Sequence, residues 1–187
     1  AESFAADIHI PTHRVAVLRT LVFPEPDKKS QPPSPLSLNA KLTITAFENG
    51  FAELSRGGWV YAAHILSFDA KVSDWVASAE RFVGLPYLWG GKDSSAADCS
   101  GVVQTALETG GIAAPRDADM QEDSVGHKIP LNSDLERGDL IFWPGHVGLM
   151  RSSTELLHAN GFHMQTVVEP LADTIARIGA PRTIRRL

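Results

Sequence analysis

The pattern of apolar positions changes near residue 69. Before it, short runs rich in β-branched and aromatic residues are separated by turn-forming residues, which is typical of strands. The expected strands are 15–18, 41–47, 51–54 and 58–61. They predict a small β-barrel over residues 12–68. The stretch from Pro24 to Pro35 holds five prolines among polar residues, which predicts a long exposed loop within that barrel.

After residue 69 the apolar residues recur at intervals of three and four, the spacing of an amphipathic helix. We expect this helix over 72–83, with Asp69 or Ser73 as its cap. A second helix is expected over 99–109, with Asp98 as its N-cap.

The polar stretch 117–126 reads as helix or loop. The strands expected after it are 139–143, 146–150, 155–159 and 166–168. Helices followed by a sheet give an α+β order, so we predict an α+β domain over 69–187.

Composition narrows the classes of partner. With 187 residues and 43% apolar content, the chain can bury a core. Its net charge of −5 offers no basic face for nucleic acid or for an anionic membrane surface. No apolar run reaches the roughly 18 residues of a membrane span. The single cysteine excludes an intramolecular disulfide and directs attention to nucleophilic chemistry.

Cys99 lies in the run Asp98-Cys99-Ser100-Gly101, at the expected start of a helix. Free N–H groups and the positive end of the helix dipole stabilise a thiolate there, so we expect a lowered pKa for Cys99. The preceding Trp89-Gly90-Gly91 predicts a loop whose backbone approaches closely. On this context alone, a buried structural cysteine is as well supported as a nucleophile.

Two histidines are candidates for the base. His146 begins a strand and shares a face with Gly148, which leaves room for a substrate or a helix. His158 follows twelve residues later, and this even spacing permits the two to lie directly opposite, at about 5 Å between Cβ atoms. His158 would then accept the Nδ1 proton of His146 and leave Nε2 to meet the thiol. Singly each histidine reads as a partly buried strand residue, but with Cys99 they favour a triad.

A metal site is the alternative use of these side chains. Cys99, His146, His158 and His163 are possible zinc ligands, but the chain has no C-x-x-C pair and no H-E-x-x-H helix. Neither a G-x-S-x-G elbow nor a phosphate-binding P-loop motif is present. We therefore expect no metal and no cofactor.

Several ordered motifs within residues 70–180 closely resemble the NlpC/P60 family, and the N-terminal part is more loosely similar to a bacterial SH3 domain. The motifs are Gly84-Leu85-Pro86-Tyr87-Leu88-Trp89-Gly90-Gly91, Asp98-Cys99-Ser100-Gly101, Pro115-Arg116-Asp117-Ala118 with Gln121, Arg137-Gly138-Asp139-Leu140-Ile141-Phe142, His146-Val147-Gly148 and Leu157-His158-Ala159.

This resemblance implies a papain-like fold and a triad of Cys99, His146 and His158. In relatives with SH3 domains it further implies a cysteine endopeptidase that cleaves γ-D-glutamyl-L-diamino acid bonds in murein peptides or peptidoglycan. The compartment and the oligomeric state stay open, with the bacterial cytoplasm favoured over the periplasm or cell envelope.

The resemblance also assigns substrate contacts. Tyr87 would line the site, Asp98 and Ser100 would contact the free amino end of the substrate, and Arg116 would lie near the D-glutamyl carboxylate. Each has a structural alternative, since Asp98 is a natural cap, Arg116 a surface charge and Tyr87 a packed ring. Some relatives carry two SH3 domains where only one is found here, which leaves specificity for a free N-terminal L-Ala open.

Two other functions fit the same residues. One is a non-catalytic peptidoglycan-binding module, against which the complete Cys-His-His set argues. The other is an acyltransferase on the same fold, which passes the acyl group to an amine or alcohol instead of water.

Overall fold

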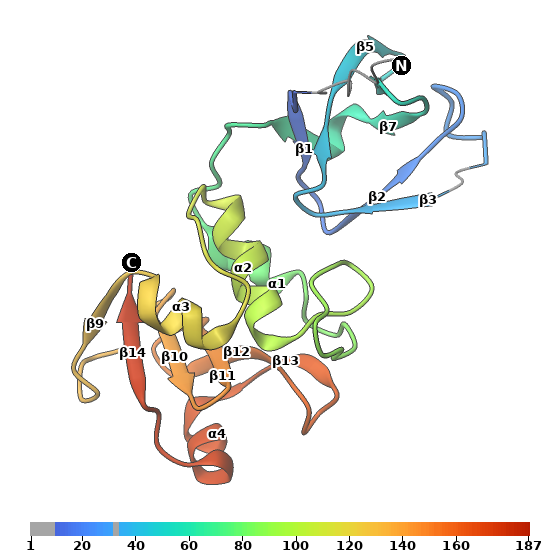
Figure 1. Cartoon of the computed structure of the whole chain (residues 1–187). Helices are drawn as coiled ribbons and strands as arrows, with labels where there is room; N and C mark the ends of the chain where they lie inside the picture. Colours follow the sequence, from blue (N-terminus) through green and yellow to red (C-terminus); the bar gives the residue numbers. More distant parts are fainter. Residues whose placement is uncertain (1–9, 32–33) are drawn as a thin grey trace, which may run out of the picture. The chain divides into compact units, whose positions relative to one another are not determined.

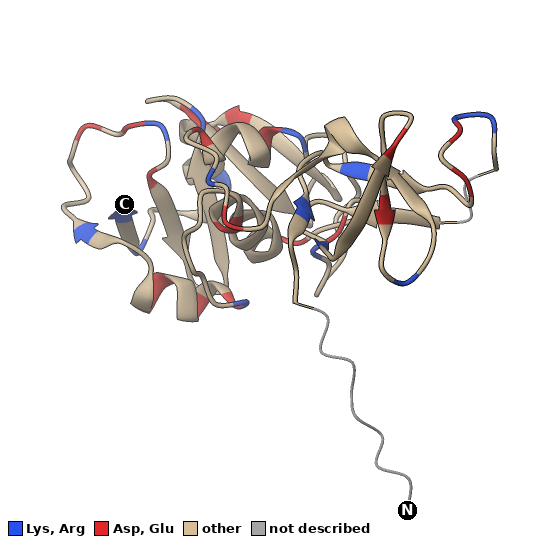
Figure 2. Cartoon of the chain, turned by 90° about the horizontal axis from the view of Figure 1, so that it is seen from above, with Lys and Arg blue, Asp and Glu red and all other residues tan. Residues whose placement is uncertain are grey.

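The computed structural model describes residues 10–31 and 34–187 (Figure 1). The chain forms two compact units, Ala1–Ala70 and Lys71–Leu187. Basic and acidic residues are mixed along both units (Figure 2), and in the second unit many opposite charges form ion pairs. Among the helices in the described ranges, none combines the length and apolarity needed to cross a bilayer.

The first unit is built from short antiparallel strands in three small sheets, ordered β4-β1-β8, β2-β3 and β5-β6-β7. The elements are β1 (His13–Val15), β2 (Arg19–Val22), β3 (Ser34–Ser37), β4 (Lys41–Leu42), β5 (Ile44–Glu48), β6 (Phe51–Leu54), β7 (Trp59–Tyr61), a 3-10 turn at Ala62–His64 and β8 (Ile65–Ser67). Their core consists of Val15, Leu42, Ala52, Val60 and Ile65. Over the described residues no closed barrel is formed, so the predicted SH3-like barrel is not confirmed.

The proline-rich stretch is shorter as a loop than predicted. Pro35 lies within β3 and pairs with Leu21 of β2. A proline is tolerated there because β3 is an edge strand, and among the described strands only β2 pairs with it. Pro32 and Pro33 fall outside the described residues.

The second unit is organised around one antiparallel sheet of order β13-β12-β11-β10-β14-β9. Its strands are β9 (His127–Ile129), β10 (Leu140–Trp143), β11 (His146–Met150), β12 (Glu155–Asn160), β13 (Gln165–Pro170) and β14 (Thr183–Arg186). Its helices are α1 (Trp75–Glu80), α2 (Cys99–Thr109), α3 (Ala118–Ser124) and α4 (Leu171–Ile178). The unit therefore mixes helices and sheet, as expected, with β9, β14 and α4 added to the predicted elements.

Helices cover both faces of the sheet. Alpha2 contacts β11 and β12, whereas Leu171 and Ile175 of α4 pack against a cluster that contains Met150 and Leu156. Strand β10 is fully buried, which explains why its sequence Leu140-Ile141-Phe142-Trp143 is an unbroken apolar run instead of an alternating one.

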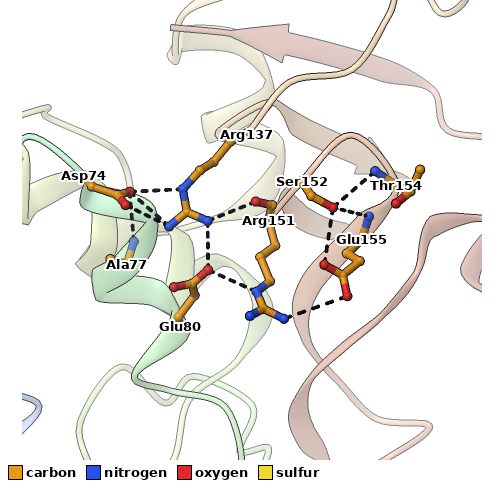
Figure 3. A network of polar contacts seen from close by, with 8 residues as sticks. All are labelled: Asp74, Ala77, Glu80, Arg137, Arg151, Ser152, Thr154 and Glu155. Atoms are coloured by element: carbon orange, nitrogen blue, oxygen red, sulfur yellow. Dashed lines mark hydrogen bonds and ion pairs between the residues drawn. The ribbon is translucent and has the colours of Figure 1, made fainter.

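Alpha1 is shorter than predicted and its cap is Asp74, not Asp69 or Ser73. Asp74 accepts a hydrogen bond from the Ala77 N–H and is paired with Arg137, which also contacts Glu80 and the Arg151 carbonyl oxygen. Figure 3 shows this network, in which Arg137 stands between Asp74, the N-cap of α1, and Glu80, its last residue. Arg137 binds the carboxylate of the capping residue Asp74 and the carbonyl oxygen of Arg151. It thereby ties the start of α1 to the turn after β11.

Candidate active site

Cys99 is the first residue of α2, and Asp98 is its N-cap as predicted. The Asp98 carboxylate accepts a hydrogen bond from the Gly101 N–H at 2.7 Å. A Cβ atom at Gly101 would lie 2.3 Å from the carbonyl oxygen of Gly91, so the glycine loop packs directly on the first turn of the helix. The close backbone approach predicted for this loop is therefore present, and Cys99 itself is only 7% exposed.

The prediction of a lowered pKa for Cys99 is wrong. Burial raises the pKa of the thiol, and the charge of Asp98 adds to this. Hydrogen bonds from the backbone N–H groups of Val147 and Ser100 act in the opposite direction without reversing the result. Cys99 is thus a protonated thiol at neutral pH, because desolvation outweighs the helix N-terminus. It needs a neighbouring base to become a nucleophile.

His146 and His158 meet, but not in the predicted register. The pairs Leu149↔Leu157 and Met150↔Leu156 place His158 opposite Gly148 when this register is continued. The two histidines are therefore diagonal neighbours on one face of the sheet. Even spacing is also no general criterion, since His158 pairs with Val167 at an odd separation. Register, which depends on the loop between strands, decides which residues are opposed.

The ring nitrogen through which His146 contacts His158 also differs from the prediction. His146 uses Nε2, not Nδ1, to contact Nδ1 of His158 at 2.8 Å. The nitrogen of His146 that His158 leaves unused is therefore Nδ1. Gly148 makes room for Leu156 rather than for a substrate, because a Cβ there would lie 2.8 Å from that side chain.

The thiol contacts the backbone beside His146, at the start of β11. The N–H of Val147, the residue after His146, hydrogen-bonds the Cys99 sulfur. Burial lowers the pKa of His146 to about 4, and the nearby His158 and the charge of Arg177 lower it further. His146 is consequently neutral at physiological pH, the state in which an imidazole accepts a proton.

A cavity of about 770 Å³ opens in front of the thiol. Cys99, Tyr87, Asp98, Ser100 and Arg116 all line it. The structure thus brings the four residues nominated as substrate contacts into one cavity with the cysteine.

Arg116 and Asp98 are paired within this cavity at 2.7 Å. Arg116 also donates to Ser100 Oγ at 2.9 Å and to the Gly91 carbonyl at 3.1 Å, and Asp98 accepts from the Gly90 N–H at 2.8 Å. These bonds hold the glycine loop and the nucleophile helix together. Asp98 and Arg116 have this structural task whatever they contribute to binding.

A second cavity of about 440 Å³ is lined by His146, His158, Phe162 and Arg177. Pro144 lines both cavities, so they adjoin at the turn before His146.

Sequence reasoning missed Glu169 and Arg177. Glu169 Oε1 lies 2.7 Å from His158 Nε2, and Arg177 pairs with the same carboxylate. Glu169 had no signal of its own, because it follows the predicted strand 166–168 as an ordinary charged residue, and Arg177 lies on the unpredicted α4.

No metal centre is found in the described part of the chain, where no three of its His, Cys, Asp and Glu side chains are grouped to hold an ion. His163, a possible zinc ligand on composition, instead contacts Asn160 Oδ1 through Nδ1 at 3.1 Å.

These features define a mixed α and β domain with a cysteine at a helix start and a histidine pair on the adjoining sheet. Residues 84–176 match the model of the NlpC/P60 family. The crystal structure of the NlpC/p60 domain of peptidoglycan hydrolase SagA is 31% identical with a TM-score of 0.53, and the match covers 62% of this chain and 97% of that domain. The chain therefore belongs to the NlpC/P60 family.

Two further comparisons extend over more of the chain. The gamma-D-glutamyl-L-lysine dipeptidyl-peptidase of Bacillus subtilis is 30% identical over 157 residues, which is 75% of this chain and 51% of that protein. A crystal structure of an NlpC/P60 family protein from Bacillus cereus covers 98% of this chain and 65% of its own, with a TM-score of 0.81 and 24% identity, and shows the likeness of fold. The chain spans about half the length of the Bacillus subtilis relative.

Proposed function

We propose that the chain is a cysteine peptidase that hydrolyses γ-D-glutamyl-L-diamino acid bonds in murein peptides. Cys99 is its nucleophile, His146 its base and His158 the partner of that base. The observation that carries the proposal is a buried, protonated thiol whose sulfur accepts a hydrogen bond from the Val147 N–H, directly after the neutral His146 in the chain. The substrate class is supported by the name of the Bacillus subtilis relative.

The chemistry runs through a thioester. Nδ1 of His146 takes the thiol proton as Sγ of Cys99 attacks the γ-carbonyl carbon, and the oxyanion accepts a hydrogen bond from the backbone N–H of Cys99. The C–N bond then breaks, and His146 gives the proton to the departing amine. Water attacks the thioester next, with His146 taking its proton, and the returning proton restores the thiol. A neutral base suits both halves, since each begins with proton removal.

The large cavity supplies the recognition of the acyl side. Arg116 keeps 29% of its side chain exposed despite its bonds to Asp98 and Ser100, so its guanidinium can also receive the carboxylate of a D-glutamyl residue. Tyr87 lines the same cavity. The first unit would serve as an SH3-like module that binds the wall.

Defined peptides test this proposal. The full chain is incubated with L-Ala-γ-D-Glu-L-Lys, with its diaminopimelate counterpart and with an isomer linked through the α-carboxyl, and the products are weighed by mass spectrometry. We expect release of L-Ala-D-Glu from the γ-linked peptides only, and none from the Cys99→Ser variant.

Two outcomes would overturn it. Intact peptides together with retention on peptidoglycan would indicate a binding module. If glycinamide is added and the acyl group is transferred to it in preference to water, the chain would be an acyltransferase.

A further inference from the structure

The row of polar contacts that begins at His146 continues beyond His158. Strands β11, β12 and β13 are adjacent in the sheet and carry His146, His158 and Glu169. Since His158 pairs with Val167, Glu169 is again a diagonal neighbour on the same face. The contacts along this row are 2.8 Å between the histidines and 2.7 Å from His158 Nε2 to Glu169 Oε1.

Arg177 closes the row from α4, the helix that follows β13 (Figure 1). Its guanidinium contacts both oxygens of Glu169, with 3.1 Å from Nη1 to Oε2. The Phe162 ring stacks on it at 4.5 Å from its centroid. The Glu169 side chain is 12% exposed and that of His158 only 1%, so this carboxylate is placed in a largely dry environment.

Hydrogen-bond direction then fixes each proton in turn. Burial raises the pKa of Glu169, but bonds from Arg177 and His158 outweigh this and bring it to about 2. A carboxylate only accepts, so Nε2 of His158 must carry the hydrogen. Burial lowers the pKa of His158, whose neutral ring therefore accepts at Nδ1. His146 must donate from Nε2, and its Nδ1 keeps the lone pair.

One contact of His158 favours the opposite tautomer, with the hydrogen on Nδ1. Asn160 Nδ2 lies 3.0 Å from His158 Nε2, and an amide donor there would prefer a bare nitrogen. The amide cannot simply turn over, because Asn160 Oδ1 accepts from the His163 backbone N–H at 2.8 Å. The carboxylate contact is shorter and charge-assisted, and two lone pairs at 2.7 Å would repel strongly, so Glu169 decides the tautomer.

We infer that Glu169, held in place by Arg177, is a positioning residue that selects the tautomer of His158 and, through it, that of His146. Its carboxylate leaves the lone pair of His146 on Nδ1, the nitrogen available to the thiol. This inference rests on the proposed function for its kinetic consequence, but the tautomers themselves can be measured without turnover.

The test compares Glu169→Gln with the wild-type chain at pH 7. Histidine ring nitrogens are labelled with 15N, assigned by single-histidine substitutions and read by long-range 1H–15N correlation. We expect His146 and His158 to carry the hydrogen on Nε2 in the wild type. In Glu169→Gln, whose amide can donate to His158, we expect a shift toward the Nδ1 tautomer in both rings, with kcat lowered by roughly 10²-fold or more at little change in KM.

Glu169→Asp and Asp139→Asn are the companion variants. Aspartate still only accepts, so Glu169→Asp should keep the wild-type tautomers and recover part of kcat even where Glu169→Gln folds poorly. Asp139→Asn makes the same carboxylate-to-amide change at the buried Asp139–Arg186 pair, outside the histidine row. It should lower stability and leave both tautomers unchanged.

Unchanged tautomers in a folded Glu169→Gln chain, with or without loss of activity, would overturn the inference and reduce Glu169 to an anchor for α4. A wild-type chain with the expected tautomers but no cleavage of any γ-linked peptide would instead overturn the proposed function.

Discussion

Nε2 of His146 lies 2.8 Å from Nδ1 of His158, although the two residues are diagonal and not opposed in the sheet. The diagonal geometry turns the Nε2 edge of the His146 ring toward β12 and leaves Nδ1 outside the contact with His158. Under the proposed function the two rings therefore have unequal roles. His146 would handle the proton, whereas His158 would orient His146 and accept its hydrogen bond.

This division of labour predicts unequal losses on substitution. His146→Ala should lower kcat by about 10²- to 10⁴-fold, because no base remains. His158→Asn or His158→Gln should keep measurable activity, since an amide oxygen still accepts the hydrogen of Nε2. Acyl-enzyme formation is followed by mass, with circular dichroism as the control for folding. Equal and complete loss in all the folded variants would show that the roles are assigned wrongly.

The low pKa of His146 predicts where activity begins. As the pH rises through about 4, His146 loses its proton and becomes a base, so kcat/KM should climb there and not near 6.5. The pH profile of kcat/KM measures this, with refolding checked after each acid exposure. An acidic limb near the ordinary histidine value would mean that His146 is solvated during turnover.

The raised pKa of Cys99 predicts slow alkylation at neutral pH. Burial keeps the thiol protonated, so the rate of modification by iodoacetamide should begin to rise at a higher pH than it does for an ordinary thiol. The alkylation rate is measured from pH 5 to 10, with glutathione as reference. A plateau already present at pH 6 would instead indicate a thiolate-imidazolium pair and would restore the expectation from the helix start.

The parts of the site that depend on short sequence patterns could be predicted. Asp98 and Cys99 are recognised as cap and first helical residue because that signal spans only four positions. His146 and His158 could be nominated as partners, but their nitrogens could not, because the register depends on the loop between β11 and β12. The pKa of Cys99 was misjudged because burial is a property of the tertiary structure.

Glu169 and Arg177 show a different limit. Helix α4 begins at Leu171 directly after β13, with Pro170 at its N-cap and no capping side-chain bond. No capping side chain therefore marked its start, and Asp173 in its first turn was too weak a signal to separate it from the preceding strand. In the first unit, strands of two to five residues left the sheet pairing undetermined, and the expected barrel did not follow from them.

The network in Figure 3 predicts a modest, salt-sensitive contribution to stability. Arg137→Met removes the contacts of Arg137 to Asp74 and Glu80, whose side chains are partly exposed, so the free energy of unfolding should fall by about 1 kcal/mol. Arg151→Met is the matched control and should cost less, because its contacts to Glu80 and Glu155 are longer, at 3.2 and 3.8 Å.

Urea unfolding at low and at high salt measures both variants. The difference between Arg137→Met and wild type should shrink at high ionic strength. A difference that is independent of salt would assign the effect to packing of the arginine side chain.

The pairing of Asp98 with Arg116 sharpens a test of specificity for the amino end of the substrate. If Asp98 receives an ammonium group, acetylating that end should cost roughly 1 to 3 kcal/mol in kcat/KM, the range for a broken semi-buried charge contact. Asp98→Asn should abolish this difference. Asparagine also caps helices, so the variant keeps the bond to the Gly101 N–H and folds, whereas Asp98→Ala should lose about 1 kcal/mol of stability.

The comparison uses L-Ala-γ-D-Glu-diamino acid peptides and their N-acetylmuramyl forms on both chains. Equal cleavage of the two forms by the wild type would mean that Arg116 already satisfies Asp98, at 2.7 Å, and leaves it no role in selecting an ammonium group. The enzyme would then act on wall-linked stems as readily as on released peptides, because the cavity would be open at the amino end.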